Sequence, residues 1–128
     1  MMTPEFFRLD KRLALITGSS GGIGFALARG LAQSGATVIL NGRNADKLEA
    51  AATELRAESL NVHTRAFDAS DATAVQTAID EIESTLGAID ILINNAGMQR
   101  RAPLEDFTTE HWHELMRTNV DSVFLVGQ

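Results

Sequence analysis

A glycine-rich turn stands between a predicted strand and a predicted helix near the start of the chain. Residues 13–16 are apolar, and the next eight residues, Thr17–Gly24, contain four glycines and two serines. Glycine permits a tight turn and lets a ligand approach the main chain closely. The helix that follows presents unpaired N–H groups and a positive dipole end, which attract an anion. This order of elements predicts a turn that holds a phosphate group.

The spacing of the glycines is compatible with two patterns. Gly18, Gly22 and Gly24 form G-x-x-x-G-x-G, whereas Gly18, Gly21 and Gly24 form G-x-x-G-x-x-G. The G-x-G-x-x-G pattern of many dinucleotide-binding proteins does not fit, because Leu27 stands where its last glycine would be. Both remaining patterns are compatible with a bound nucleotide.

Strand and helix patterns alternate along the rest of the chain. Apolar or β-branched runs predict strands at 13–17, 37–40, 62–67 and 89–93, with helical patterns between and after them. This alternation predicts an α/β fold, a Rossmann-type doubly wound parallel sheet of about four strands with helices on both faces. A ligand is expected at the carboxyl ends of its strands. We find no linker and expect a single domain over residues 1–128.

Capping residues predict where three of the helices begin. Asn44 precedes the second helix, Ser70 or Asp71 the third, and Thr108 the last, and each of these side chains can accept a backbone N–H. The last helical pattern continues to Gln128 without a stop signal. We therefore expect an incomplete sheet, the first half of a larger domain.

Two of the expected helices carry apolar residues at helical spacing. Ile23, Leu27 and Leu31 recur along the first helix, and Trp112 on the last helix is expected in the core. Asn119 lies on the same stripe as Trp112, seven residues later. A buried amide needs hydrogen-bond partners, and from spacing alone the favoured partner is a neighbouring backbone group.

Composition excludes several classes of function. The net charge is -6, which disfavours nonspecific binding to nucleic acid or to an anionic membrane. No apolar run approaches the ~20 residues that span a bilayer, and the first ten residues lack the apolar core of a signal peptide. The chain has no cysteine, hence no disulfide or thiolate metal site, and no motif for another metal. We expect a soluble, cytoplasmic protein without metal, membrane or nucleic-acid partners.

The residues after the second strand bear on the choice of nucleotide. A site for NAD usually carries an acidic residue here, ~20 residues past the glycines, to bind the ribose hydroxyls. That position is Gly42, which has no carboxylate, and Arg43 follows it. The planar guanidinium suits a 2′-phosphate. The sequence therefore favours NADP(H) over NAD(H), although an ordinary surface arginine is the alternative.

Polar motifs also follow the third and fourth strands. Asp68 could accept a hydrogen bond from an adenine amino group or cap the next helix. The run Asn94–Gly97 combines asparagines, which bond backbone groups, with small residues that would admit a cofactor. A tight turn alone would explain the same run.

Together these motifs resemble the classical short-chain dehydrogenase/reductase family, over Lys11 to Gln128. The resemblance implies that Gly18, Ser20, Gly21, Ile23 and Gly24 surround the cofactor phosphates and ribose, and that Arg43 and Asn44 hold the 2′-phosphate. It implies that Asp68 and Ala69 bind the adenine and that Asn95, Ala96 and Gly97 lie under the ribose. Asn119 would be the catalytic-tetrad asparagine, placing a water that links to the catalytic lysine.

A narrower resemblance is to the gluconate 5-dehydrogenases of that family. It rests on residues 98–107, on Phe7–Leu9 and on Asn41–Asn44. Such enzymes interconvert D-gluconate and 5-keto-D-gluconate, and Arg100 and Arg101 would suit a sugar-acid carboxylate or serve a structural or interface role. The 3-oxoacyl-carrier-protein reductases share every cofactor motif and differ mainly around residues 99–103.

The family's catalytic residues cannot be assigned in this chain. The family places a serine and a Tyr-x-x-x-Lys motif beyond the tetrad asparagine, and this chain has no tyrosine. We therefore expect a chain truncated before that segment, inactive by itself, whose full-length form is an NADP-dependent oxidoreductase and a homo-oligomer, tetramer or dimer. A non-catalytic dinucleotide-binding module is the alternative from another class.

Overall fold

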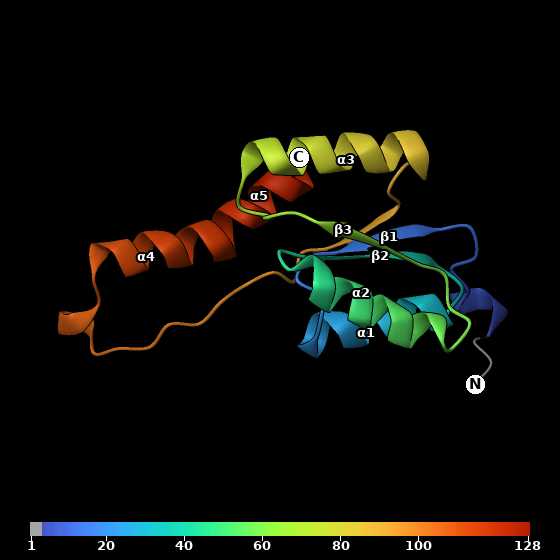
Figure 1. Cartoon of the computed structure of the whole chain (residues 1–128), viewed down its shortest axis with the longest axis horizontal. Helices are drawn as coiled ribbons and strands as arrows, with labels where there is room; N and C mark the ends of the chain where they lie inside the picture. The colour runs from blue at the N-terminus through green and yellow to red at the C-terminus, as the bar shows by residue number, and fades with distance from the viewer. Residues whose placement is uncertain (1–3) are drawn as a thin grey trace.

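A computed structural model describes residues 4–128, so the first three residues of the expected domain lie outside the described residues. Four parallel strands form one sheet in the order β3-β2-β1-β4 (Figure 1). The strands are β1 (Leu13–Ile16), β2 (Thr37–Gly42), β3 (Val62–Ala66) and β4 (Ile91–Ile93). The expected Rossmann-type parallel sheet is confirmed. Strand β2 is two residues longer than predicted, β4 is two residues shorter, and β1 and β3 are one residue shorter each.

The helices follow the strands in the expected alternation. They are α1 (Gly22–Gln33), α2 (Ala45–Arg56), α3 (Ala72–Thr85), α4 (Thr109–Met116) and α5 (Ser122–Gly127). Short 3-10 turns occur at Glu5–Phe7 and Leu104–Asp106, and a π-helical turn, η3 (Arg117–Asp121), joins α4 to α5. Within residues 4–128 no helix has both the length and the apolar character needed to cross a membrane.

The sheet is covered on both faces. In Figure 1, α1 and α2 lie below it, and α3 and α5 lie above it. Alternate residues of a strand point to opposite faces, so Ala14 and Ile16 pack with α1 and α2, whereas Leu13 and Leu15 pack with α3 and α5. A strand buried on both faces explains the uninterrupted apolar run of β1.

Three of the predicted caps are present. The Asn44 side chain accepts from the N–H of Lys47 at 3.0 Å and begins α2. Asp71, rather than Ser70, caps α3, and Thr108 caps α4. Each cap therefore fixes where a helix starts relative to the end of the preceding strand or loop.

The apolar stripe of α1 differs from the face that it buries. Gly24, Ala28 and Ala32 are buried against the sheet, whereas Ile23 is 75% exposed and Leu27 is exposed as well. Small side chains let the helix lie close to the strands, which a stripe of large residues would prevent. The helix was correctly predicted, and of its three apolar residues at helical spacing Leu31 packs against the core, whereas Ile23 and Leu27 are exposed.

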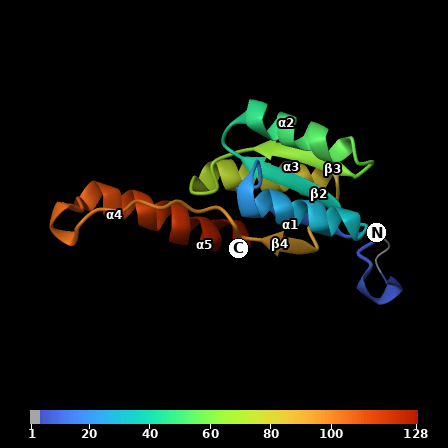
Figure 2. The ribbon, with the colours of Figure 1, turned by 90° about the horizontal axis from the view of Figure 1, so that it is seen from below.

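The prediction that Trp112 lies in the core is wrong, because its side chain is 52% exposed. Helix α4 extends away from the sheet (Figures 1 and 2), so in the described part of the chain nothing covers that side of it. The single helix expected after Thr108 is also interrupted by η3, the turn that contains Asn119.

Candidate functional site

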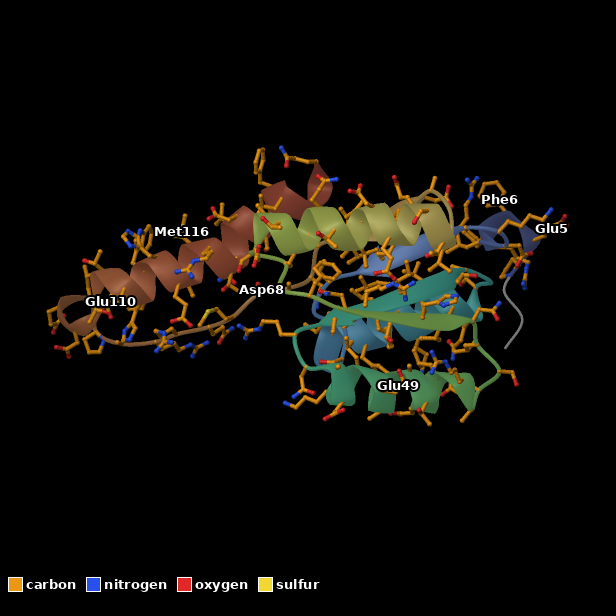
Figure 3. All side chains as sticks on the ribbon, turned by 45° about the horizontal axis from the view of Figure 1, so that its top comes forward. Glu5, Phe6, Glu49, Asp68, Glu110 and Met116 are labelled. Carbon is orange, nitrogen blue, oxygen red and sulfur yellow. The ribbon has the colours of Figure 1, made fainter. Side chains whose placement is uncertain are left out.

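A cavity of about 620 Å³ opens at the carboxyl ends of the strands. Its wall is formed by the β1–α1 turn, the end of β2, the segments after β3 and β4, and part of the α4–η3 arm. The predicted cofactor residues that line it are Gly18, Ser20, Gly21, Arg43, Asn44, Asp68, Ala69, Ala96 and Gly97. Figure 3 shows one of them, Asp68, where the arm meets the sheet. Segments far apart in sequence thus converge on one cavity.

The glycine turn packs against the segment that follows β4. Gly18 has a φ of +61°, and a Cβ added to it would lie 2.9 Å from the Cα of Ala96. A Cβ on Gly24 would lie 2.5 Å from Nδ2 of Asn95 and 2.6 Å from the Gly18 carbonyl oxygen. Glycine at these two positions is therefore required by close approach of the backbone, and at Gly18 also by the left-handed conformation.

Gly21 faces open space instead. A Cβ added there would meet no atom within 4 Å, although Gly21 lines the cavity. It precedes α1, whose first turn has no side-chain cap. The N–H groups that begin this helix are therefore free to bind an anion in the cavity. This geometry fits a phosphate group at the turn.

Thr17 and Asn95 join the two segments. The Thr17 Oγ1 accepts from the N–H of Asn95 at 3.0 Å and from that of Ala96 at 2.9 Å. The Asn95 side chain in turn donates to the Gly18 carbonyl at 3.0 Å. Asn95 thus holds the glycine turn in place, and it does so from outside the cavity lining.

The buried side chain of Asn41 belongs to the site, although its place in the motif Asn41–Asn44 did not indicate this role. Its Oδ1 accepts from the Gly18 N–H, and its Nδ2 donates to the carbonyls of Arg65 and Phe67. The Asn41 N–H donates to Oγ of Ser19 at 3.0 Å. A polar residue near the end of an otherwise apolar strand was the signal that could have identified it.

Asp68 presents an ionised carboxylate to the cavity. Its Oδ1 accepts from the hydroxyl of Ser70 at 2.7 Å and from the Ser70 N–H at 2.9 Å. The Ser70 hydroxyl is the largest cause of a lowered pKa for Asp68; partial burial opposes it, and Arg43 and Arg117 assist. The Oδ2 has no hydrogen-bond partner among residues 4–128, which leaves it free to accept from a ligand amino group.

Two basic side chains border the cavity beyond β2. Arg43 was predicted, but Lys47, in the first turn of α2, was not. Gly42 lies beside them, and a Cβ built on it would contact Oγ of Ser20 and Cδ2 of Leu48 at 3.6 Å each, an ordinary van der Waals distance. There is thus space for a Cβ at position 42, and the sequence leaves this position without a carboxylate.

Asn119 is bonded to neighbouring backbone, as spacing alone favoured. Its Oδ1 accepts from the Met98 N–H at 2.7 Å, and its Nδ2 donates to the Met98 carbonyl at 2.9 Å. Both hydrogen bonds hold the segment after β4 against η3. The role of Asn119 in placing a water stays a prediction.

The remaining predicted residues lie outside the cavity lining. They are Ile23, Gly24, Asn95, Arg100 and Arg101. Arg100 forms an ion pair with Glu114 at 2.8 Å, and Arg101 is exposed. Glu114 itself lines the cavity, so the pair brings Arg100 next to its wall.

Comparison with known proteins identifies relatives along nearly the whole chain. The family model for short chain dehydrogenase matches residues 12–128. The chain is 53% identical to gluconate 5-dehydrogenase of Gluconobacter oxydans, over 100% of this chain and 50% of the relative. It is 39% identical to 5-keto-D-gluconate 5-reductase of Escherichia coli, over 97% of this chain and 49% of the relative.

A solved structure agrees with these relatives. The crystal structure of a gluconate 5-dehydrogenase from Burkholderia cenocepacia in complex with NADP and tartrate matches with a TM-score of 0.90 and 53% identity. The match covers 95% of this chain and 48% of that one. The chain therefore spans about half the length of the relatives that it matches.

Proposed function

Because the chain belongs to the short-chain dehydrogenase family, we propose that the full-length protein is an NADP-dependent oxidoreductase. Its reaction interconverts D-gluconate and 5-keto-D-gluconate by hydride transfer. The observation that carries the proposal is the cavity in which the open glycine turn at Gly21 faces Arg43 and Asp68. The substrate assignment is supported by relatives named for this reaction.

The residues present fit NADP(H). Gly18, Ser20 and Gly21 would receive the diphosphate at the start of α1, and Arg43 and Asn44 would hold the 2′-phosphate. The free Oδ2 of Asp68 would accept from the adenine amino group beside Ala69. The proposal also keeps Ile23, Gly24, Asn95, Ala96 and Gly97 as neighbours of the phosphates and ribose. When bound, the nicotinamide supplies or accepts the hydride.

The catalytic proton transfer is assigned to the other half of the protein. We propose that a serine and a Tyr-x-x-x-Lys motif follow this 1–128 half-domain, since the chain covers about half of its relatives. Asn119 would act as the tetrad asparagine. Arg101, which is exposed, and Arg100, which is bonded to Glu114 beside the cavity, would attract the substrate carboxylate.

The cellular compartment and the oligomeric state of the enzyme are part of the same proposal. We place the full-length protein in the cytoplasm, where NADPH is available, acting as a homo-oligomer. Support for association comes from apolar side chains that are exposed on helices α4 and α5, namely Trp112, Val123 and Phe124. A dimer or tetramer would bury such a surface.

An assay of the full-length protein tests the function. With NADPH and 5-keto-D-gluconate we expect oxidation of NADPH and formation of D-gluconate, and the reverse reaction with NADP and D-gluconate. A 3-oxoacyl thioester of carrier protein is the control substrate, because reductases for it share the cofactor motifs. Turnover of the thioester but not of the keto acid would overturn the substrate assignment. Tight NADPH binding without turnover of either would favour a non-catalytic module.

A further inference from the structure

Lys47 borders the same end of the cavity as Arg43, four residues away. Both side chains are exposed, and both line the cavity. The Lys47 N–H is held by the capping side chain of Asn44 at 3.0 Å, so the first turn of α2 is fixed beside the end of β2. The backbone positions that carry the two cations thus belong to one short segment, which the Asn44 cap holds in place.

Neither cation forms an ion pair within the described chain, although Arg43 lies close enough to Asp68 to help lower the pKa of that carboxyl. The ion pairs within residues 4–128 engage six arginines, and none involves Arg43 or Lys47. Farther along the same helix, by contrast, Arg56 is bonded to Glu49 at 2.6 Å. In a chain of net charge -6, two unpaired cations at the rim of a cavity create a local attraction for an anion.

The groups around Arg43 and Lys47 indicate which kind of anion these two side chains would bind. Position 42, next to Arg43, carries no side chain, and a Cβ built there would lie 3.6 Å from the hydroxyl oxygen of Ser20, which lines the same cavity as both cations. A phosphate monoester offers several acceptor oxygens, enough for a guanidinium, an ammonium and a hydroxyl together. A single carboxylate has two acceptor oxygens and one negative charge, so it matches two cations and a hydroxyl less well than a phosphate monoester of nearly two charges.

We propose that Lys47 is a second specificity-determining residue, whose ammonium binds the 2′-phosphate of NADP(H) together with Arg43. This inference rests on the proposed function, because it concerns the same cofactor. Two residues on either side of the Asn44 cap, Arg43 and Lys47, would then discriminate against NAD(H) together, and Arg43 would not do so alone.

Equilibrium binding to the full-length protein tests the inference without reference to turnover. The Kd values of NADPH and NADH are measured by nucleotide fluorescence for the wild type, Lys47→Gln, Arg43→Gln and the double variant. Lys11→Gln is the matched control, because Lys11 is the other lysine in the chain and is exposed before β1, at the opposite end of the strand.

We expect Lys47→Gln to weaken NADPH binding about fivefold, the upper range for an exposed ion pair, and to leave NADH binding unchanged. Lys47→Arg, which keeps the charge, should retain tight NADPH binding, and Lys11→Gln should behave as the wild type.

Unchanged NADPH affinity in Lys47→Gln would overturn the inference while leaving the proposed function intact. Equal loss for NADPH and NADH would overturn it too, since the lost contact would not be with the 2′-phosphate. A wild type that binds neither nucleotide, or that prefers NADH, would reject the proposed cofactor together with the inference.

Discussion

The side chain of Asn41 holds the main chain of Gly18 in the wall of the cavity. The Gly18 N–H donates to Oδ1 of Asn41 at 3.2 Å, and Nδ2 of the same amide donates to the carbonyls of Arg65 and Phe67 at 3.2 and 3.1 Å. One buried amide therefore connects the glycine turn after β1 with the end of β3, next to Asp68. The two ends of the proposed nucleotide site are coupled through it.

Replacing Asn41 by leucine, which has a similar volume, should destabilise the protein. The variant leaves the Gly18 N–H and the carbonyls of Arg65 and Phe67 without this partner, and an unsatisfied buried group costs about 1–3 kcal/mol. We expect the free energy of unfolding of the full-length protein, from urea denaturation, to fall by about 3 kcal/mol. Asn61→Leu, at an exposed position, is the control and should change it little. Equal stability of Asn41→Leu and the wild type would contradict the role given to this amide.

Alanine at Gly18 and alanine at Gly21 should affect different properties, the first stability and the second nucleotide binding. At Gly18 the methyl group would meet the Cα of Ala96 at 2.9 Å, and the left-handed backbone adds about 1–2 kcal/mol of strain. At Gly21 the φ is -170°, extended backbone, and the methyl group meets nothing within 4 Å.

We therefore expect Gly18→Ala to lower the free energy of unfolding by more than about 2 kcal/mol, measured by urea denaturation. Gly21→Ala should leave that free energy nearly unchanged and weaken NADPH binding, because its methyl group enters the cavity. A destabilised Gly21→Ala that still binds NADPH normally would show that the turn is structural only.

The features that the sequence predicted well are local ones. The strand β1, the caps at Asn44 and Thr108, and the glycine turn each depend on residues a few positions apart. Their hydrogen bonds and dihedral preferences act within one segment, so a single sequence suffices. The parallel direction of the strands then follows from the alternation of strands and helices along the chain.

The features that it missed depend on partners distant in the chain. Trp112 has an apolar pattern around it, but exposure is decided by whether another element covers α4, and none among the described residues does. Asn41 bonds residues more than twenty positions away on both sides. Lys47 is a candidate site residue because it lines a cavity whose other walls are formed by the segments after β1 and β3. None of these relations has a fixed spacing that a pattern could detect.

Removal of the Ser70 hydroxyl should raise the pKa of Asp68 toward the ordinary carboxyl value. That hydroxyl bond is the largest cause of the lowered pKa, and burial of Asp68 acts in the opposite direction. Ser70→Ala keeps the N–H of residue 70 and the charges of Arg43 and Arg117, which continue to lower the pKa against the effect of burial. A titration of the Asp68 carboxyl carbon by NMR measures the change directly.

The same variant has a predictable effect on stability. A pKa that is lower in the folded state stabilises the protein above the unfolded-state pKa, and this contribution is lost as the pH falls through the folded-state pKa. Ser70→Ala should therefore be less stable than the wild type at neutral pH, and the difference should shrink at a pH below both values. A difference that grows on acidification would contradict the assignment, and Ser84→Ala, exposed on α3, provides the control.

A carboxylate introduced at position 42 should move the cofactor preference from NADPH to NADH. The Cβ of Gly42→Asp would contact Oγ of Ser20 and Cδ2 of Leu48 at 3.6 Å, an ordinary van der Waals distance, so this atom is accommodated without displacement of the backbone. There it would pair with Arg43 and Lys47, repel a 2′-phosphate and accept hydrogen bonds from the ribose hydroxyls of NADH. We expect the ratio of kcat/KM for NADPH to that for NADH, with 5-keto-D-gluconate, to fall by a factor of at least about ten, or about 1.4 kcal/mol.

Gly42→Asn, with nearly the same shape and no charge, should change the ratio much less. If both variants shift the ratio equally, the shape of the side chain rather than its charge is responsible, and the electrostatic basis proposed for NADP(H) selection at Arg43 and Lys47 is wrong.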